Sequence, residues 1–108
     1  MQTLARRSAT DLQRRYVYGR DNGKCHYCHV SLQYNNFHVD HKQPWSKGGP
    51  TKLSNLVASC YICNIAKNDM DYHRYINLLE EKGLAWRRKR YFGVKSSFAI
   101  SKTKKALS

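Results

Sequence analysis

The four cysteines of this sequence fall into two C-x-x-C pairs, Cys25 with Cys28 and Cys60 with Cys63. Four thiolates are the ligand set of a structural zinc site, because tetrahedral coordination by sulfur leaves no position open for a substrate. Redox pairs and disulfides are the alternatives, but thiols inside most cells are kept reduced and available to metals. The cysteines therefore predict structural zinc, and the long segment between the pairs must hold folded structure of its own.

That segment, 36-NFHVDHKQPWSKGGPTKLSNL-56, carries the polar residues that could do chemistry. Asp40 and His41 stand at the end of one predicted strand, Asn55 stands at the start of the next, and Asn64 opens a predicted helix after the last cysteine. A neutral imidazole can take a proton from water near pH 7. Taken alone, His41 would be interpreted as a surface or packing histidine.

Short elements position these residues. Phe37 and Val39 alternate with polar neighbours as in a half-buried strand, and residues 56–58 form a second short apolar run. Two prolines and two glycines lie between these runs, so residues 42–54 are predicted to form a loop without regular structure. A capping-box pattern, Thr10 with Gln13, predicts a helix over residues 10–20. Its apolar stripe is expected at Leu12, Tyr16 and Gly19.

The second half of the chain is predicted to be helical from about Ile62. Asn68 or Asp69 could cap a further helix that ends at Gly83. One face of this helix would carry Tyr72, Ile76 and Leu79.

Charge dominates the composition: 20 Lys and Arg face 7 acidic residues, a formal net charge of +13 in 108 residues. Nucleic acid is the leading partner for such a chain, whereas a solvated basic surface and anionic lipid are the alternatives. From Lys82 to Lys105 there is no acid, and the run 87-RRKR-90 lies among the aromatic residues Trp86, Tyr91, Phe92 and Phe98. These rings could stack on bases or dock the segment on the domain, and we expect docking.

The pattern from Cys25 to Lys67 is C-x-x-C, then V-D-H-x-x-P-x-S-x-G-G, then S-N-L, then C-x-x-C-N-x-x-K. It resembles the HNH endonuclease family, whose ββα-metal or His-Me finger module cuts nucleic acid. The chain departs from the name at the last letter, where Asn64 stands in place of histidine. The resemblance implies an α+β fold, a small ββα-metal domain with a four-cysteine zinc site and flanking helices. We expect an N-terminal helical segment at 1–19, the nuclease domain at 20–82 and a basic tail at 83–108.

The resemblance also implies roles for single residues. His41 is expected to be the general base, with Asp40 and Asn64 holding catalytic Mg²⁺ or Mn²⁺. Asn55 would hold the loop through its backbone and keep the histidine aimed, and Asn64 could also be a helix N-cap. Lys67 could touch phosphate or be a solvated lysine. The other nucleic-acid-binding candidates are Arg87, Arg88, Lys89 and Arg90.

The expected function is a metal-dependent DNA endonuclease, acting on double-stranded DNA as a monomer or homodimer. A zinc-stabilised nucleic-acid-binding module without catalysis is the alternative, and the set Asp40, His41, Asn55 and Asn64 favours the enzyme, because binding alone does not need it. A structural zinc protein that acts through protein contacts would explain neither the set nor the charge. Without an apolar run of membrane-spanning length or a signal-peptide core, the protein is expected inside the cell, in the cytoplasm or at the nucleoid or nucleus.

Overall fold

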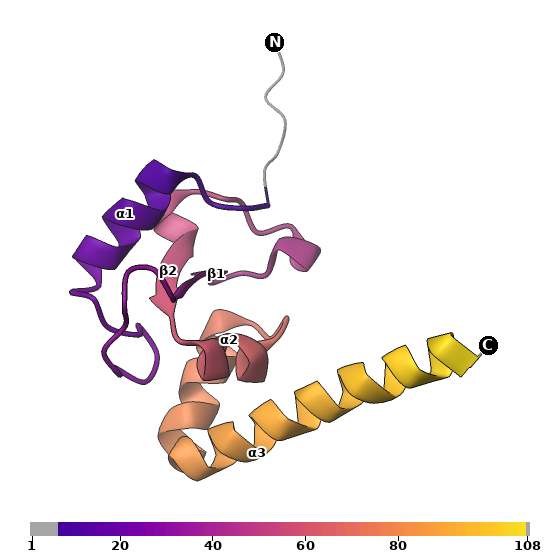
Figure 1. Ribbon diagram of the computed structural model, residues 1–108. Coiled ribbons are helices and arrows are strands. Elements are labelled where there is room, and N and C mark those ends of the chain that lie inside the picture. The colour runs from indigo at the N-terminus through magenta and orange to yellow at the C-terminus, as the bar shows by residue number, and fades with distance from the viewer. Residues whose placement is uncertain (1–6, 108) are drawn as a thin grey trace.

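The computed structural model describes the backbone of residues 7–107 and the side chains of residues 7–97. The first six residues of the predicted N-terminal segment and the side chain of Phe98 therefore lie outside the described part. The elements, in order, are α1 (Asp11–Arg20), β1 (His38–His41), β2 (Leu56–Ser59), α2 (Tyr61–Lys67) and α3 (Tyr72–Leu107) (Figure 1). Two antiparallel strands followed by α2 confirm the predicted α+β class and the ββα-metal arrangement.

The two strands place the polar residues of the motif at one end of the sheet. Asp40 pairs with Val57, and His41 pairs with Leu56. Every residue of β2 is buried, so this strand forms the centre of the core. The loop between the strands matches the predicted residues 42–54 but is not wholly irregular, because single 3-10 turns form at Trp45–Lys47 and Leu53–Asn55.

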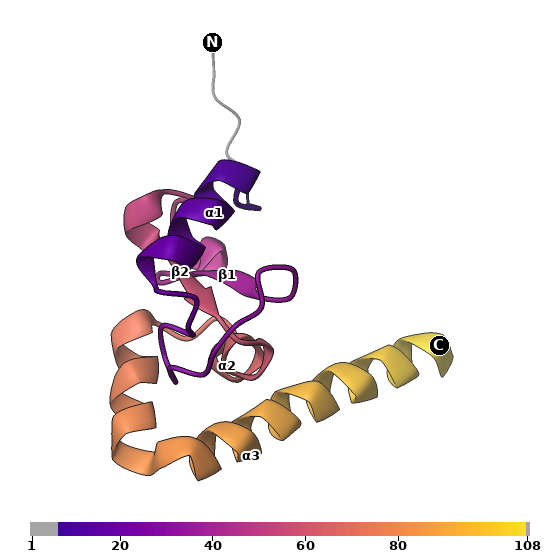
Figure 2. The same cartoon turned by 60° about the vertical axis from the view of Figure 1, so that its left-hand side comes forward.

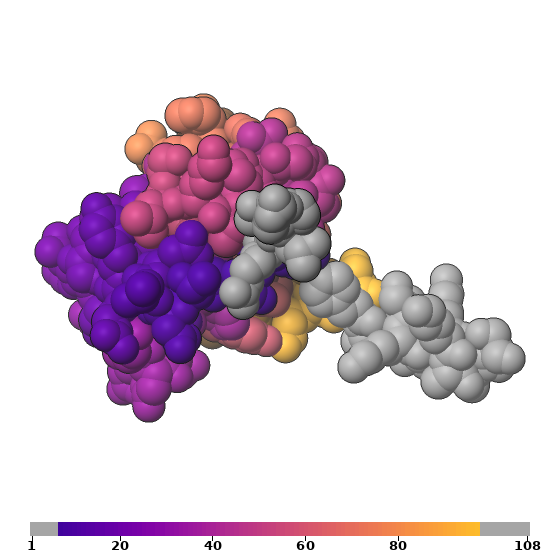
Figure 3. Space-filling model, turned by 90° about the horizontal axis from the view of Figure 1, so that it is seen from above, coloured from indigo at the N-terminus to yellow at the C-terminus, as the bar shows by residue number. Residues whose placement is uncertain are grey.

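Helix α1 begins as predicted but buries a different face. Both halves of the capping box between Thr10 and Gln13 are present. The expected apolar stripe is wrong: Leu12 is 75% exposed and Tyr16 is 53% exposed, whereas Val17 is completely buried. Polar contacts fix this orientation, because the Gln13 amide donates to the Thr51 carbonyl oxygen at 3.1 Å. The surface of α1 accordingly lies beside that of the 42–54 loop (Figure 3).

The connection between α2 and α3 also differs from expectation. Asn68 ends α2 at φ 52° rather than capping the next helix. Asp71, and neither Asn68 nor Asp69, provides the cap, since its Oδ2 accepts from the backbone N–H of His73 at 3.2 Å. Three side chains of the first half of α3 pack against the core, as predicted: Tyr72, Ile76 and Leu79.

The predicted end of the helix at Gly83 is wrong, because α3 continues to Leu107. This glycine has φ 77° and ψ −172°, so it kinks α3, and the chain continues as a helix beyond it. The boundary that we place between residues 82 and 83 coincides with this kink and stays a prediction. Trp86 and Tyr91 pack against the core and Val94 is buried, so the start of the basic segment is docked. The far part of α3 projects away from the body (Figures 1 and 2). No helix in the described residues has the length and apolar character of a membrane span.

The corrected face of α1 yields a first prediction. Val17→Ala should lower the free energy of unfolding by about 2 kcal/mol, because it leaves a cavity beside β2. Leu12→Ala, a matched truncation on the exposed face, should change it by less than about 0.5 kcal/mol. Chemical denaturation of the two variants measures both values. Equal losses would show that α1 packs through the stripe expected from the sequence.

Candidate active site and metal centre

The four cysteines meet at one point, as their spacing predicts. All four sulfur atoms lie within 4.8 Å of one another, and the Cys28 and Cys60 sulfurs are 3.7 Å apart. A tetrahedral zinc with Zn–S bonds of about 2.3 Å needs sulfurs about 3.8 Å apart. In each pair the second backbone N–H points at the first sulfur, at 3.5 Å from Cys28 to Cys25 and 3.3 Å from Cys63 to Cys60. The cluster is therefore positioned to hold structural zinc.

The protons of these thiols are strongly coupled. The pKa of Cys25 is lowered because the Cys28 thiol and its neighbours donate to its sulfur. The pKa of Cys63 is raised because its thiol donates to Cys25 and because it is buried. A metal that binds all four sulfurs must displace the remaining protons, so zinc retention should weaken in acid.

A cleft of about 520 Å³ lies beside the sheet end and collects the polar residues of the motif. Asp40 and His41 line it from β1, and Asn64 lines it from α2. Arg7 from the N-terminal segment and Trp45 from the loop complete this set. The structure thus brings together side chains from four separate segments of the chain.

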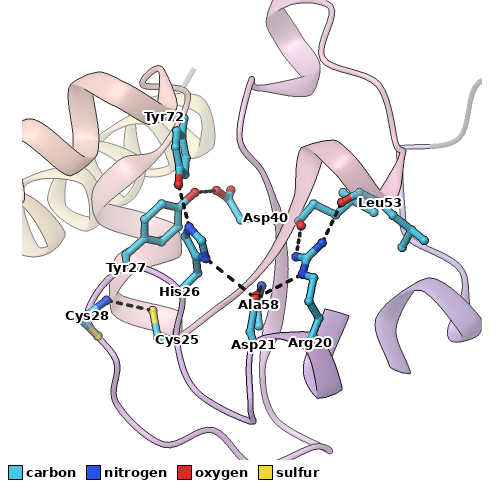
Figure 4. Close-up of polar contacts among 11 residues, drawn as sticks. Arg20, Asp21, Cys25, His26, Tyr27, Cys28, Asp40, Leu53, Ala58 and Tyr72 are labelled. Carbon is cyan, nitrogen blue, oxygen red and sulfur yellow. Dashed lines mark hydrogen bonds and ion pairs between the residues drawn. The ribbon is translucent and has the colours of Figure 1, made fainter. Parts of the chain in front are cut away.

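Asp40 is a carboxylate held from one side. It is 7% exposed, and its Oδ2 accepts a hydrogen bond of 2.5 Å from the Tyr27 hydroxyl (Figure 4) and lies 3.3 Å from the Lys67 ammonium. Burial raises the pKa of Asp40, and the Lys67 charge opposes that rise. Burial also raises the pKa of Tyr27, so its hydroxyl remains a donor. Both contacts fall on Oδ2, and Asp40 also lines the cleft.

Lys67 has a role that neither alternative from the sequence describes. Its side chain is completely buried, so it is not a solvated lysine. Its ammonium donates to the backbone carbonyl of His41 at 3.0 Å while pairing with Asp40. One lysine of α2 thereby holds two adjacent residues at the end of β1.

His41 is oriented through a hydroxyl. Its Nε2 lies 2.9 Å from Thr51 Oγ1, and the same hydroxyl donates to the Arg7 carbonyl at 3.3 Å. The Thr51 hydroxyl therefore holds the imidazole through Nε2 and ties it to the N-terminal segment. Burial lowers the pKa of His41. The Asp40 charge opposes this shift, whereas the positive charges of Arg7 and Lys67 add to it. The ring is therefore neutral near pH 7.

Asn55 ties the loop together through backbone groups. Its Oδ1 accepts from Gln43 N–H at 2.9 Å, and its Nδ2 donates to the carbonyl oxygens of Gln43 at 3.2 Å and Pro50 at 2.9 Å. Gly49 permits this closure, because a Cβ there would stand 1.9 Å from the Gln43 carbonyl oxygen. The loop consequently returns to the sheet end with His41 and Thr51 adjacent.

Comparison with known proteins agrees with this geometry. The HNH endonuclease family model matches residues 25–70, which include both cysteine pairs and the cleft residues of β1 and α2. The matched segment also holds the four-cysteine cluster, in agreement with the four-cysteine type of this family. The family implies a nuclease or another function on nucleic acid. Among curated proteins, none matches the chain significantly.

Within the matched segment, Asn64 is not a helix N-cap. Cys60 caps α2 by accepting from the N–H of Cys63, and Asn64 lies inside the helix. Its side chain is therefore not needed to satisfy the helix terminus, and it lines the cleft with Asp40 and His41.

The four cations of the 87–90 run do not share one environment. The Arg87 guanidinium lies against two of the cysteine sulfurs, and Arg90 Nε donates to the Ala66 carbonyl at 2.8 Å. Arg88 and Lys89 are exposed. That all four bind nucleic acid stays a prediction, and the exposed Arg88 and Lys89 are the two whose side chains are not held by the cysteine cluster or by α2.

Arg7 is a cleft residue that the sequence alone did not indicate. It lies outside the HNH motif, and nothing in the surrounding residues distinguishes it from its neighbour Arg6. Only the fold brings it into the cleft with His41.

The loop closure yields a second prediction. Gly49→Ala should lower the free energy of unfolding by about 3 kcal/mol, because the new methyl group overlaps Gln43. Gly93→Ala is the control: it has open space around it on an exposed helical turn and should stabilise by about 0.5 to 1 kcal/mol. Thermal or chemical unfolding of both variants provides the measurement. A neutral Gly49→Ala would mean that the loop is not closed in this way.

Proposed function

We propose that this protein is a metal-dependent DNA endonuclease that hydrolyses phosphodiester bonds at the cleft of Asp40, His41 and Asn64. The observation that carries the proposal is the placement of His41, whose ring is held by Thr51 through Nε2 in the same cleft as the Asp40 carboxylate and Asn64. A module that only binds nucleic acid has no use for this pairing.

Asp40 and Asn64 would hold the catalytic metal. Their carboxylate and amide oxygens are hard donors, which favour Mg²⁺ or Mn²⁺ over a second zinc. When bound, such an ion polarises the phosphate and stabilises charge on the leaving oxygen. Tyr27 and Lys67 both hold Asp40 Oδ2, and these two contacts fix the direction of the carboxylate.

His41 acts as the general base. Nδ1 takes a proton from the attacking water, and Nε2–H remains bonded to Thr51, which fixes the ring during the transfer. The new P–O bond forms as the bond to the 3′ oxygen breaks, and that oxygen is protonated by solvent. The products carry a 5′-phosphate and a 3′-hydroxyl. Arg7 lies in the same cleft and contributes positive charge near the phosphate.

Double-stranded DNA is the proposed substrate, held mainly through its phosphates. Arg88 and Lys89 offer exposed cations on α3, and affinity of this kind falls steeply with salt. A single site cuts one strand, so a monomer would nick and a double-strand break would need a dimer or two events. We place the nuclease domain at 20–82, between the segment 1–19 and the basic tail 83–108.

The proposal predicts loss of cutting without loss of structure in His41→Ala. With supercoiled plasmid in Mg²⁺, in Mn²⁺ and in chelator, the wild type should nick only with metal. The variant should be slower by at least about a hundredfold, because it lacks the base. His73→Ala, which removes an exposed histidine of α3, is the control and should cut at the wild-type rate.

Zinc content and DNA affinity should be equal in all three proteins. If His41→Ala cuts at the wild-type rate, His41 is not the base. If the wild type binds plasmid but cuts it in none of these conditions, the non-catalytic module is the better description.

A separate prediction concerns Arg7. Arg7→Ala should lower the cleavage rate at saturating DNA by about tenfold or more, because a charge that stabilises the transition state is removed. Arg15→Ala, which truncates an exposed arginine on α1, should leave this rate unchanged. Single-turnover cleavage in Mg²⁺ separates the effect on rate from the effect on binding. A change confined to affinity would reduce Arg7 to a binding residue.

A further inference from the structure

We infer that Arg87 is part of the four-cysteine metal site and that it anchors the basic half of α3 to that site. Its Nη1 lies 3.5 Å from the Cys63 sulfur and 3.7 Å from the Cys60 sulfur. Both distances are those of hydrogen bonds in which an N–H group donates to sulfur. The inference rests on the zinc site and does not depend on nuclease activity.

Charge explains why an arginine is needed there. Four thiolates around Zn²⁺ carry a net charge of −2, and both Cys25 and Cys63 are fully buried. Such a charge is stable only with compensating donors or cations. Arg87 brings a cation that stays ionised and can share two N–H groups between neighbouring sulfurs. Its Nε is buried without a hydrogen-bond partner in the described part of the chain, so the group is held there for contacts on its other nitrogens.

Further contacts extend the anchor along α3. Arg90, one turn later, donates to the Ala66 carbonyl of α2, and Val94 is buried after one more turn. Lys95 Nζ lies 2.9 Å from the Tyr61 hydroxyl at the start of α2. The inner face of the helix is thus bound to α2 and to the cysteine cluster, while Arg88 and Lys89 face outward.

A functional consequence follows from this geometry. Without the metal, the four sulfurs lose their common ligand, and Arg87 loses the closed anionic cluster that it contacts. Metal loading therefore stabilises the docked position of the helix, and the docked helix in turn slows metal loss. The zinc site would set where the two outward cations are presented.

The test compares neighbouring arginines in the full-length protein. Arg87→Gln and Arg88→Gln each remove one charge from the same helix. The two variants differ in whether the lost side chain faced the cysteine cluster or the solvent. In the zinc form, transfer of metal to a chromogenic chelator should be at least about tenfold faster in Arg87→Gln than in wild type, since partners of metal ligands contribute at this level. Arg88→Gln should match the wild type. Arg87→Lys, which keeps the charge but not the forked donor, should be intermediate.

A spectroscopic readout accompanies the kinetics. In the cobalt(II)-substituted proteins, the sulfur-to-cobalt charge-transfer band should move to lower energy in Arg87→Gln, because its thiolates lose hydrogen-bond donors. It should stay in place in Arg88→Gln. Equal chelator rates in the two variants, with an unmoved band, would overturn the inference.

A measurement on the wild type covers the case in which Arg87→Gln does not fold. In the ¹¹³Cd-substituted protein, the guanidinium protons of Arg87 should show coupling to the metal through the N–H···S contacts. They should also exchange more slowly with solvent than those of Arg88. Rapidly exchanging, uncoupled Arg87 protons would contradict the assignment whatever the variants do.

Discussion

The buried carboxylate of Asp40 is the constraint on which the rest of the site depends. A carboxylate at 7% exposure is tolerated only when it is paired and hydrogen-bonded. Tyr27, placed between two cysteines, and Lys67, from α2, both reach the same oxygen. The first cysteine pair, the sheet end and α2 are therefore joined through one side chain. Because Lys67 also holds the His41 carbonyl, the orientation of the proposed base depends on the same contact.

A second carboxylate ties the outer elements to this centre. Asp21, at the end of α1, accepts from the backbone N–H of Ala58 at 2.8 Å and from Arg20 at 3.3 Å (Figure 4). The Nδ1 atom of His26 lies 3.9 Å from Asp21 Oδ1, and its Nε2 atom lies 2.7 Å from the Tyr72 hydroxyl. Burial lowers the pKa of His26, so the link to Tyr72 is made by a neutral ring. Helix α1, β2 and α3 meet at this network, next to the first cysteine pair.

Local chemistry explains how much of the site was predictable. Paired cysteines, and Asp40 beside His41, carry their meaning in type and spacing. The fold brings the four cysteines into one cluster and brings Asp40, His41 and Asn64 into one cleft. The burial of Lys67 could not be predicted in this way, because a lysine one turn beyond Asn64 has the same local sequence pattern whether it faces solvent or the core. Its burial follows from Asp40, which lies far away in the sequence.

The error in α1 has a related cause. A short helix with few apolar residues offers more than one apolar stripe, and Leu12 and Tyr16 share one of them. The face that packs is decided instead by polar contacts to distant backbone: Arg14 donates to the carbonyls of Phe37 at 2.9 Å and Tyr34 at 2.8 Å. With these contacts made, Val17 points to the core. Hydrophobic periodicity alone has no access to such long-range hydrogen bonds.

The same reasoning changes the meaning of the net charge of +13. A count of cations treats each one as available to a polyanion, but Arg14, Lys67, Arg87 and Arg90 are already bound to protein groups. In the 87–90 run the helical period separates the roles: the first and fourth cations face inward and the two between them face outward. Composition therefore indicates the class of partner, whereas the phase of a helix decides which cations can contact it.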